Sequence, residues 1–264
     1  IRWDYGELWR QVTTLAGGLT KAGYGPGCVV ATDLDHNAQN LLLQMAVAHN
    51  QMQVLTVKSE DEYRRLSSSI PVKGAVPAPG SSFLQGATVA ELQESGGKAG
   101  AGGTDRKAAL AFYSSDAPTG NRQVYLHGVS IAGLLAIAPT DQVCVAASLN
   151  HAFGIGGAIS AVVRSATIYL PDPASPDVGG STLLIGDEQG LAALGTRSSS
   201  TLRDGLVKVG DYSGETGIPY VNGFTEIAGV SVHELRPHGD PVFCRPLFDA
   251  CADTYYPVRE SLRK

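Results

Sequence analysis

Residues suited to phosphate binding gather in one stretch of the chain, residues 109–127. An apolar run at residues 109–113 predicts a strand, and a loop and a second short apolar strand are predicted to follow it. A loop of this kind can direct backbone N–H groups and hydroxyls into a concavity that fits phosphate oxygens. The loop residues with hydroxyl, glycine or basic character are Ser114, Ser115, Thr119, Gly120 and Arg122.

Two residues of the same loop oppose this chemistry. Asp116 would face a phosphate with like charge, which costs about 1–4 kcal/mol at about 4 Å for effective dielectric constants between 80 and 20. Pro118 removes one N–H donor from the loop. Arg122 is equally consistent with a surface-loop arginine that has no ligand. The stretch therefore looks like a phosphate-binding loop with impaired chemistry.

Alternating helix and strand patterns must position this loop. Capping signals at Asp4 and Ser59, with acidic residues three positions later, predict helix starts. Apolar residues at helical spacing, alternating with short apolar runs, predict parallel sheets covered by helices. The predicted strands are residues 28–32, 53–57, 109–113, 142–147, 166–170, 218–221 and 229–235, with further short elements in 181–209. The predicted helices begin near Asp4 and cover residues 37–50, 59–66, 87–94, 129–138 and 153–163.

Composition limits the function classes. The chain has 264 residues, 43% of them hydrophobic, and a net charge of −5, which argues against a nucleic-acid or anionic-membrane surface. Without an apolar run of about 18 residues, no membrane span is expected. Its four cysteines form no CxxC pair, so buried free thiols are expected, and a disulfide between Cys244 and Cys251 stays open. A glycine-rich linker at residues 95–104 predicts a first α/β subdomain over 1–105 and a second over 106–264.

Three stretches in order resemble motifs of the adenylate-forming (AMP-binding) superfamily, which includes acyl-CoA synthetases. Tyr113 to Val124 is similar to the family's phosphate loop, with Asp116 at a glycine position and Arg122 at the lysine. Leu149-Asn-His-Ala-Phe-Gly154 is similar to the Pro-Leu-x-His-x-Phe-Gly stretch, and Asn222-Gly-Phe-Thr-Glu226 to the Tyr-Gly-x-Thr-Glu stretch. The resemblance implies an α/β fold like the N-terminal domain of an acyl-CoA synthetase: two stacked, mostly parallel sheets covered by helices, without the C-terminal domain.

The resemblance also implies roles for residues outside the loop. Gly223 and Thr225 would contact the nucleotide, Glu226 would bind Mg²⁺, and His151 would line the acyl pocket as a doubtful catalytic residue. Each also has a structural interpretation: a turn residue beside a solvated acid for Thr225 and Glu226, and a structural histidine beside an aromatic for His151. ATP and Mg²⁺ are the cofactors that an active protein would use.

Several family parts are missing from the sequence. Asn222 replaces the aromatic that stacks on adenine, unless Phe224 takes its place, and no Tyr-Arg-Thr-Gly-Asp-like ribose stretch is found. Only 38 residues follow Glu226, too few for the C-terminal domain whose lysine assists adenylation in the family.

These departures favour a catalytically degenerate protein that serves as an accessory subunit beside other protein subunits. The compartment stays open: a soluble intracellular location is expected, and a mitochondrial assembly is considered. The alternative is an ATP- and Mg²⁺-dependent carboxylate:CoA ligase or its nucleotide-binding part. A third hypothesis is a regulator that binds ATP, AMP or an acyl ligand without turnover.

Overall fold

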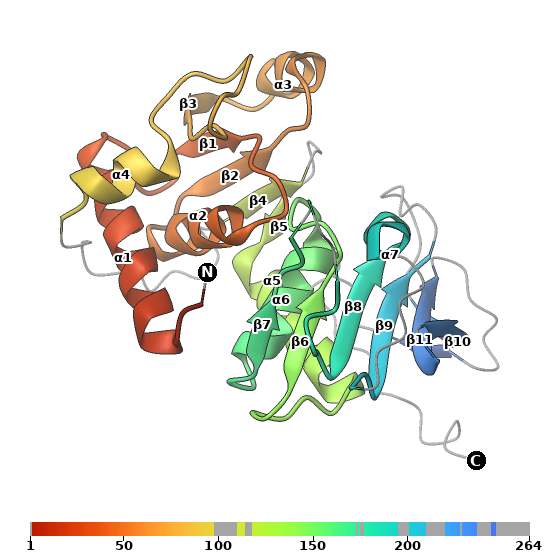
Figure 1. Ribbon diagram of the computed structural model, residues 1–264. Helices are drawn as coiled ribbons and strands as arrows, with labels where there is room; N and C mark the ends of the chain where they lie inside the picture. Colours follow the sequence, from red (N-terminus) through yellow and green to blue (C-terminus); the bar gives the residue numbers. More distant parts are fainter. Residues whose placement is uncertain are drawn as a thin grey trace. The chain divides into compact units, whose positions relative to one another are not determined.

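Helices and strands alternate along most of the chain in the computed structural model (Figure 1). The structure describes residues 2–97, 110–113, 118–172, 174, 177–194, 201–209, 220–227, 229–236 and 244–246. The chain divides into two units, residues 1–122 and 123–264. Each unit contains one mostly parallel sheet with helices, so the predicted α/β class is confirmed.

The first unit is built on a five-stranded sheet in the order β3-β1-β2-β4-β5. Strands β1 to β4 run parallel, and the short β5 pairs with β4 in the antiparallel direction. The strands are β1 (Val29–Thr32), β2 (Gln53–Thr56), β3 (Val72–Ala75), β4 (Leu110–Tyr113) and β5 (Thr119–Gly120). The helices are α1 (Tyr5–Lys21), α2 (Ala38–His49), α3 (Glu60–Ser67) and α4 (Val89–Ser95).

Each helix of the first unit begins at a side chain that accepts a backbone N–H three residues further on. The capping residues are Asp4, Asn37, Ser59 and Thr88. These bonds satisfy N–H groups that have no partner within the helix. The predicted helix starts at Asp4 and Ser59 are thereby confirmed. Thr88 forms the full reciprocal capping box, whereas at the Asp4 cap the Glu7 carboxylate bonds Arg10 and Gln11.

Alternate residues of the strands feed two separate apolar clusters on the two faces of this sheet. Val30 and Val54 pack in the cluster that contains the buried residues of α1, α2 and α4. Ala31 and Leu55 pack in the other cluster, with Leu66 of α3. The period of two in a strand explains this division. The buried strand runs recognised in the sequence are therefore buried on both faces.

The second unit contains a seven-stranded sheet in the order β12-β10-β11-β9-β8-β6-β7. Strands β7, β6, β8, β9 and β11 are parallel, and β10 is antiparallel to both of its neighbours. The strands are β6 (Gln142–Val145), β7 (Thr167–Tyr169), β8 (Leu183–Asp187), β9 (Asp204–Lys208), β10 (Tyr220–Ile227), β11 (Val230–Arg236) and β12 (Cys244–Pro246). The helices are α5 (Asn121–Leu134), whose first turn contains the boundary between the units, α6 (Ala152–Val162) and α7 (Glu188–Leu194).

Helices α5 and α6 meet at glycines. A Cβ added to Gly128 would lie 2.7 Å from Ile159 Cγ2, and one added to Gly156 would lie 2.2 Å from His127 Cδ2. The His127 ring also meets the Phe153 ring edge-on, with centroids 6.0 Å apart. The absence of side chains at these glycines lets the two helices approach closely.

Three details differ from the sequence-based expectations. Residues 109–113 were expected in the second subdomain, but β4 pairs with β2 of the first sheet. The short apolar strand expected after Arg122, in the stretch that ends at His127, is helical and belongs to α5. The predicted turn at residues 223–226 lies within β10, because those residues pair with β11.

Candidate functional site

The predicted phosphate-binding residues lie around the passage from β4 into α5. Ser114, Ser115 and Asp116 lie outside the described residues. Thr119 and Gly120 form β5, where they pair with Ala111 and Leu110 of β4.

Helix α5 starts at the very next residue. Its first turn contains Arg122, which is exposed. A helix start carries a partial positive charge, and Arg122 adds a full one. The described part of the loop is thus compatible with an anionic ligand.

His151 occupies a different position, in the second unit. It is the N-cap residue of α6, and its side chain makes no capping hydrogen bond. Its backbone is held instead: the N–H donates to the Ser148 carbonyl at 3.1 Å, and the carbonyl accepts from Ile155 N at 3.1 Å. His151 therefore lies beyond the carboxyl end of β6, where ligands bind in many open parallel sheets.

Strand order makes this edge a topological switch point. From β6 the chain passes through α6 to β7 on one side and then crosses to β8 on the other. Ligands favour the crevice at such a reversal. The loop after β6 contacts the end of β8, where the Asp187 carboxylate accepts Ser148 N–H at 3.2 Å and Gly190 N–H at 2.8 Å.

Sequence reasoning did not identify Asp187. The signal was present, since an acidic residue directly follows the apolar run Leu183–Ile185 and a glycine. A carboxylate at the carboxyl end of a buried strand is typical of a strand-end site or a helix start. In this structure it links the loop after β6 to the start of α7.

The candidate residues of the Asn222–Glu226 motif, which are Gly223, Thr225 and Glu226, lie on β10. Thr225 pairs with Val232 and Glu226 with Ser231, while Gly223 falls at the register shift between Val221 and Phe224. Because β11 runs parallel to β9, Ser231 is level with the start of β9. Glu226 is thus near the amino-terminal edge of the parallel strands.

The described backbone does not bring His151 and Glu226 together. Strands β6 and β10 are separated by four strand spacings in the sheet order, about 19 Å along the sheet. His151 follows the carboxyl ends of the parallel strands, whereas Glu226 lies toward their amino ends. One small ligand does not span both positions.

Metal-ligating residues do not cluster in the part of the chain that the structure describes. Within it, no group of three or more His, Cys, Asp or Glu side chains could hold a metal ion. Among the described cysteines, Cys28 and Cys144 are free thiols. Burial raises the pKa of the Cys144 thiol to about 12, so that thiol stays protonated at neutral pH.

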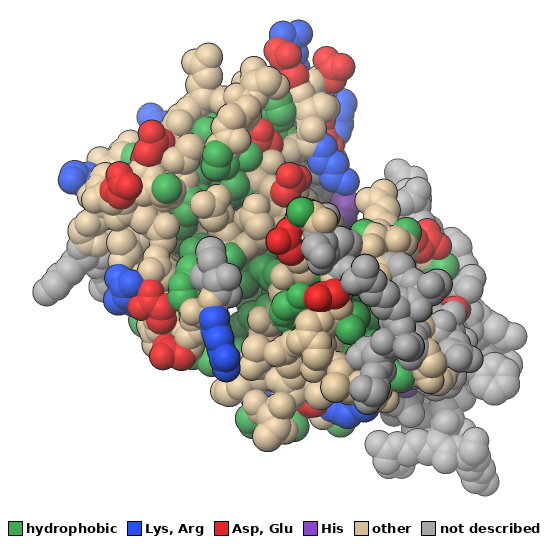
Figure 2. Space-filling model, viewed as in Figure 1, with side chains coloured by type: hydrophobic (Ala, Val, Ile, Leu, Met, Phe, Trp, Pro, Cys, Tyr) green, Lys and Arg blue, Asp and Glu red, His purple; other side chains and the backbone are tan. Residues whose placement is uncertain are grey.

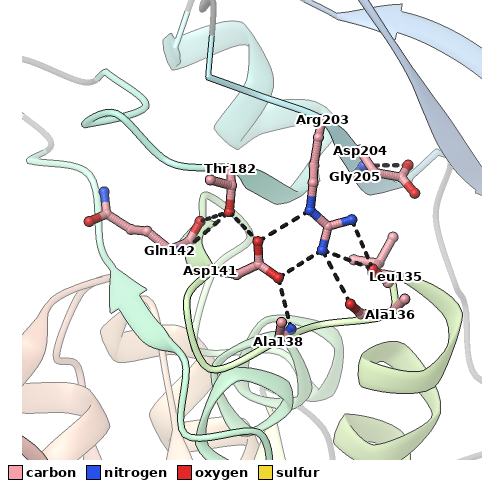
Figure 3. Close-up of polar contacts among 9 residues, drawn as sticks. All are labelled: Leu135, Ala136, Ala138, Asp141, Gln142, Thr182, Arg203, Asp204 and Gly205. Carbon is pink, nitrogen blue, oxygen red and sulfur yellow. Dashed lines mark hydrogen bonds and ion pairs between the residues drawn. The ribbon is translucent and has the colours of Figure 1, made fainter.

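A polar cluster around the buried carboxylate of Asp141 lies at the opposite, amino-terminal edge of the second sheet (Figure 3). The Asp141 carboxylate accepts from Arg203 Nη2 at 2.7 Å, from Arg203 Nε at 3.2 Å, from Thr182 Oγ1 at 2.7 Å and from Ala138 N–H at 2.8 Å. These donors, with Arg203 the largest contributor, lower the pKa of Asp141 to about 2. The same guanidinium donates to the carbonyls of Leu135 and Ala136. We call these residues the Arg203 cluster.

Comparison with known proteins supports the fold. No protein-family model and no curated protein matches the chain. Solved structures do match: o-succinylbenzoate CoA synthetase (MenE) from Bacillus subtilis in complex with its acyl-adenylate intermediate has a TM-score of 0.64 at 18% identity, over 78% of this chain and 48% of that one. VinN gives a TM-score of 0.65 at 16% identity, over 79% of this chain and 63% of that one.

A third match is the N-terminal subdomain of Klebsiella oxytoca NpsA in complex with 3-hydroxybenzoyl-AMSN. Its TM-score is 0.59 at 14% identity, over 78% of this chain and 59% of that one. MenE has also been solved with ATP and a magnesium ion. The chain has the fold of these proteins and spans about half the length of MenE. The predicted likeness to acyl-CoA synthetase N-terminal domains is confirmed at the level of the fold.

Proposed function

We propose that this protein keeps the scaffold of an adenylate-forming enzyme, does not itself complete acyl-adenylate formation, and serves as an accessory subunit of a larger assembly. The observation that carries the proposal is the separation of His151 and Glu226, four strand spacings apart and toward opposite edges of one sheet. The fold-level match supports the scaffold half of the proposal.

Acyl-adenylate formation makes strict geometric demands. A carboxylate must approach the α-phosphate to about 3–3.5 Å while a cation neutralises the phosphate oxygens. A lining residue at His151 and a metal ligand at Glu226 serve one reaction only if both face the same substrate. The described backbone of the second unit does not provide that arrangement.

The loop sequence supports the same conclusion. Asp116 stands where phosphate requires neutral or positive groups, and Pro118 supplies no N–H. Arg122 keeps one positive charge near the start of α5. We therefore expect weak nucleotide binding at most, with Arg122 as its main determinant.

A second candidate function has one observation in its favour. MenE, solved with ATP and magnesium, shares this fold over 77% of the present chain. An ATP- and Mg²⁺-dependent carboxylate:CoA ligase, or its nucleotide-binding part, is therefore the alternative. It requires Thr225 and Glu226 to face the nucleotide phosphates in the working protein.

Calorimetric titration with ATP·Mg²⁺ tests the proposal. We expect a dissociation constant weaker than about 1 mM, which corresponds to about −4 kcal/mol of binding free energy. Micromolar binding that Arg122→Ala abolishes and the exposed control Arg164→Ala preserves would contradict it. Pyrophosphate release with any member of a panel of fatty and aryl acids would establish the enzyme instead.

The accessory role has its own test. Asp116→Gly combined with Asn222→Tyr restores two residues of the family motifs. We expect the native mass of the assembly, measured by gradient sedimentation of a cell extract, to stay unchanged. Loss of the assembly after these substitutions would mean that the altered motifs themselves hold the partners. Mitochondrial fractionation of the same extract tests the compartment.

A further inference from the structure

We propose that Arg203 is a positioning residue for α5, the helix that begins directly after the candidate phosphate loop. The ligand part of this inference rests on the proposed function, through the expectation that any phosphate binding uses the first turn of α5. The positioning part rests on the Arg203 cluster alone (Figure 3).

The cluster is anchored to three strands at once. Asp141 immediately precedes β6, Thr182 immediately precedes β8, and Arg203 immediately precedes β9. Thr182 Oγ1 donates to Asp141 at 2.7 Å, and Arg203 reaches the same carboxylate through Nη2 and Nε. Since β6, β8 and β9 are hydrogen-bonded neighbours, the guanidinium is fixed relative to the sheet.

The remaining guanidinium donors hold the end of α5. Arg203 Nη2 donates to the Ala136 carbonyl at 3.2 Å, and both terminal nitrogens lie 3.4 Å from the Leu135 carbonyl. Carbonyls at a helix end lack partners within the helix, so a cation there satisfies them. Ala136 also adopts a left-handed conformation, φ 46°, which an alanine enters only at some energetic cost.

Helix α5 also packs against α6, where Gly128 faces Ile159 and Gly156 faces His127, and these positions set how closely the two helices approach. Apolar packing is non-directional, whereas the guanidinium fork fixes direction. Helix α5 has 14 residues, so it is about 21 Å long, and a tilt at its end moves its first turn, which contains Arg122.

The experiment compares Arg203→Met, Arg203→Lys and the control Arg164→Met in the full chain. Arg164 is exposed in the same unit, so its substitution removes the same charge without touching the cluster. Amide hydrogen exchange is followed by mass spectrometry at a temperature where all three variants are folded.

We expect Arg203→Met to raise exchange rates in α5 about tenfold or more while β8 amides stay within about twofold of wild type. Arg203→Lys keeps the charge but not the planar fork, so its exchange rates in α5 should fall between those of wild type and Arg203→Met. Equal acceleration in α5 and β8, which means a general loss of stability, would overturn the inference. Unchanged exchange in α5 would overturn it as well.

A second experiment, a titration with nucleotide, distinguishes failure of this inference from failure of the proposed function. Wild-type protein is titrated with ATP·Mg²⁺ up to about 10 mM, where millimolar binding is measurable. Absence of binding would overturn both the nucleotide role and the ligand part of the inference. The positioning part would still be decided by the exchange result. With binding, Arg203→Met should weaken it at least about fivefold and Arg164→Met by less than about twofold. Equal affinities of wild type and Arg203→Met would overturn the ligand part.

Discussion

At the scale of single residues, Asp141 retains its charge in a covered position because four donor contacts face it. Its side chain is only 7% exposed, and its pKa is lowered from an ordinary value of 3.8 to about 2. Burial alone would raise the pKa, so the hydrogen bonds, above all those from Arg203, outweigh desolvation. A charge held in this way makes the stability of the second unit depend on pH.

The sign of that dependence follows from linkage. A carboxyl whose pKa is lower in the folded state stabilises that state fully above the unfolded pKa, near 3.8. This stabilisation is lost as pH falls toward 2. A shift of this size corresponds to about 2 kcal/mol. We expect the difference in unfolding free energy between wild type and Asp141→Asn to shrink by about this amount between pH 6 and pH 2. Urea unfolding at several pH values measures it, and a difference independent of pH would contradict the prediction.

At the scale of elements, the packing of α5 against α6 depends on which glycines face the partner helix. Gly128 faces Ile159, whereas Gly133 in the same helix has nothing within 4 Å of an added Cβ. Position 128 requires the absence of a side chain, whereas position 133 does not. The two glycines therefore serve as a matched pair for substitution.

Substitution of each glycine by alanine should have opposite effects. Gly128→Ala forces Ile159 or the helix backbone to shift, so we expect a loss of about 1–3 kcal/mol of unfolding free energy. Gly133→Ala removes the entropic penalty of glycine in a helix and should add about 0.5–1 kcal/mol. Chemical denaturation of both variants checks the prediction. Destabilisation by both would mean that α5 does not tolerate alanine at either place.

Elements set by local contacts were predictable from sequence, and those set by distant contacts were not. The Asp4 and Ser59 caps join residues three apart, so a short window contains the whole signal. The extension of β10 through residues 223–226 depends on pairing with β11, so its motif was interpreted as a turn.

The same limit applies to the candidate site. The loop residues were proposed by residue type alone, and of these Thr119 and Gly120 lie just before α5. The extent of α5 toward its amino end was missed, because the short apolar run after Arg122 fits a strand or a helix until His127 and Gly128 meet α6. Asp187 was missed because its carboxylate accepts the N–H of Ser148, which lies 39 residues away in the sequence.

At the scale of the whole molecule, the balance of charge is slightly acidic. The net charge is −5 and the isoelectric point is about 5.7. Figure 2 shows acidic and basic side chains interspersed on the face it presents. Among the described residues, no helix is long and apolar enough to cross a bilayer.

We therefore expect no affinity for nucleic acid at physiological salt. A protein that binds phosphate backbones without sequence preference needs clustered Lys and Arg, and its affinity falls steeply with salt. Electrophoretic mobility shift with duplex DNA and single-stranded RNA at about 50 and 150 mM salt measures this. A shift that weakens between the two salt concentrations would show a basic surface that the described face does not present.

The Arg203 cluster also has a consequence for the order of folding. Its central ion pair joins residues 62 positions apart, and the Thr182–Asp141 bond joins residues 41 apart, so neither forms before β6, β8 and β9 are in register. Contacts of such sequence separation are expected late, after the transition state. Thr182→Val, which removes the hydrogen bond to Asp141, should therefore speed unfolding and leave the refolding rate of the second unit nearly unchanged. The cluster would then act on how long the native state lasts, rather than on how quickly it is reached.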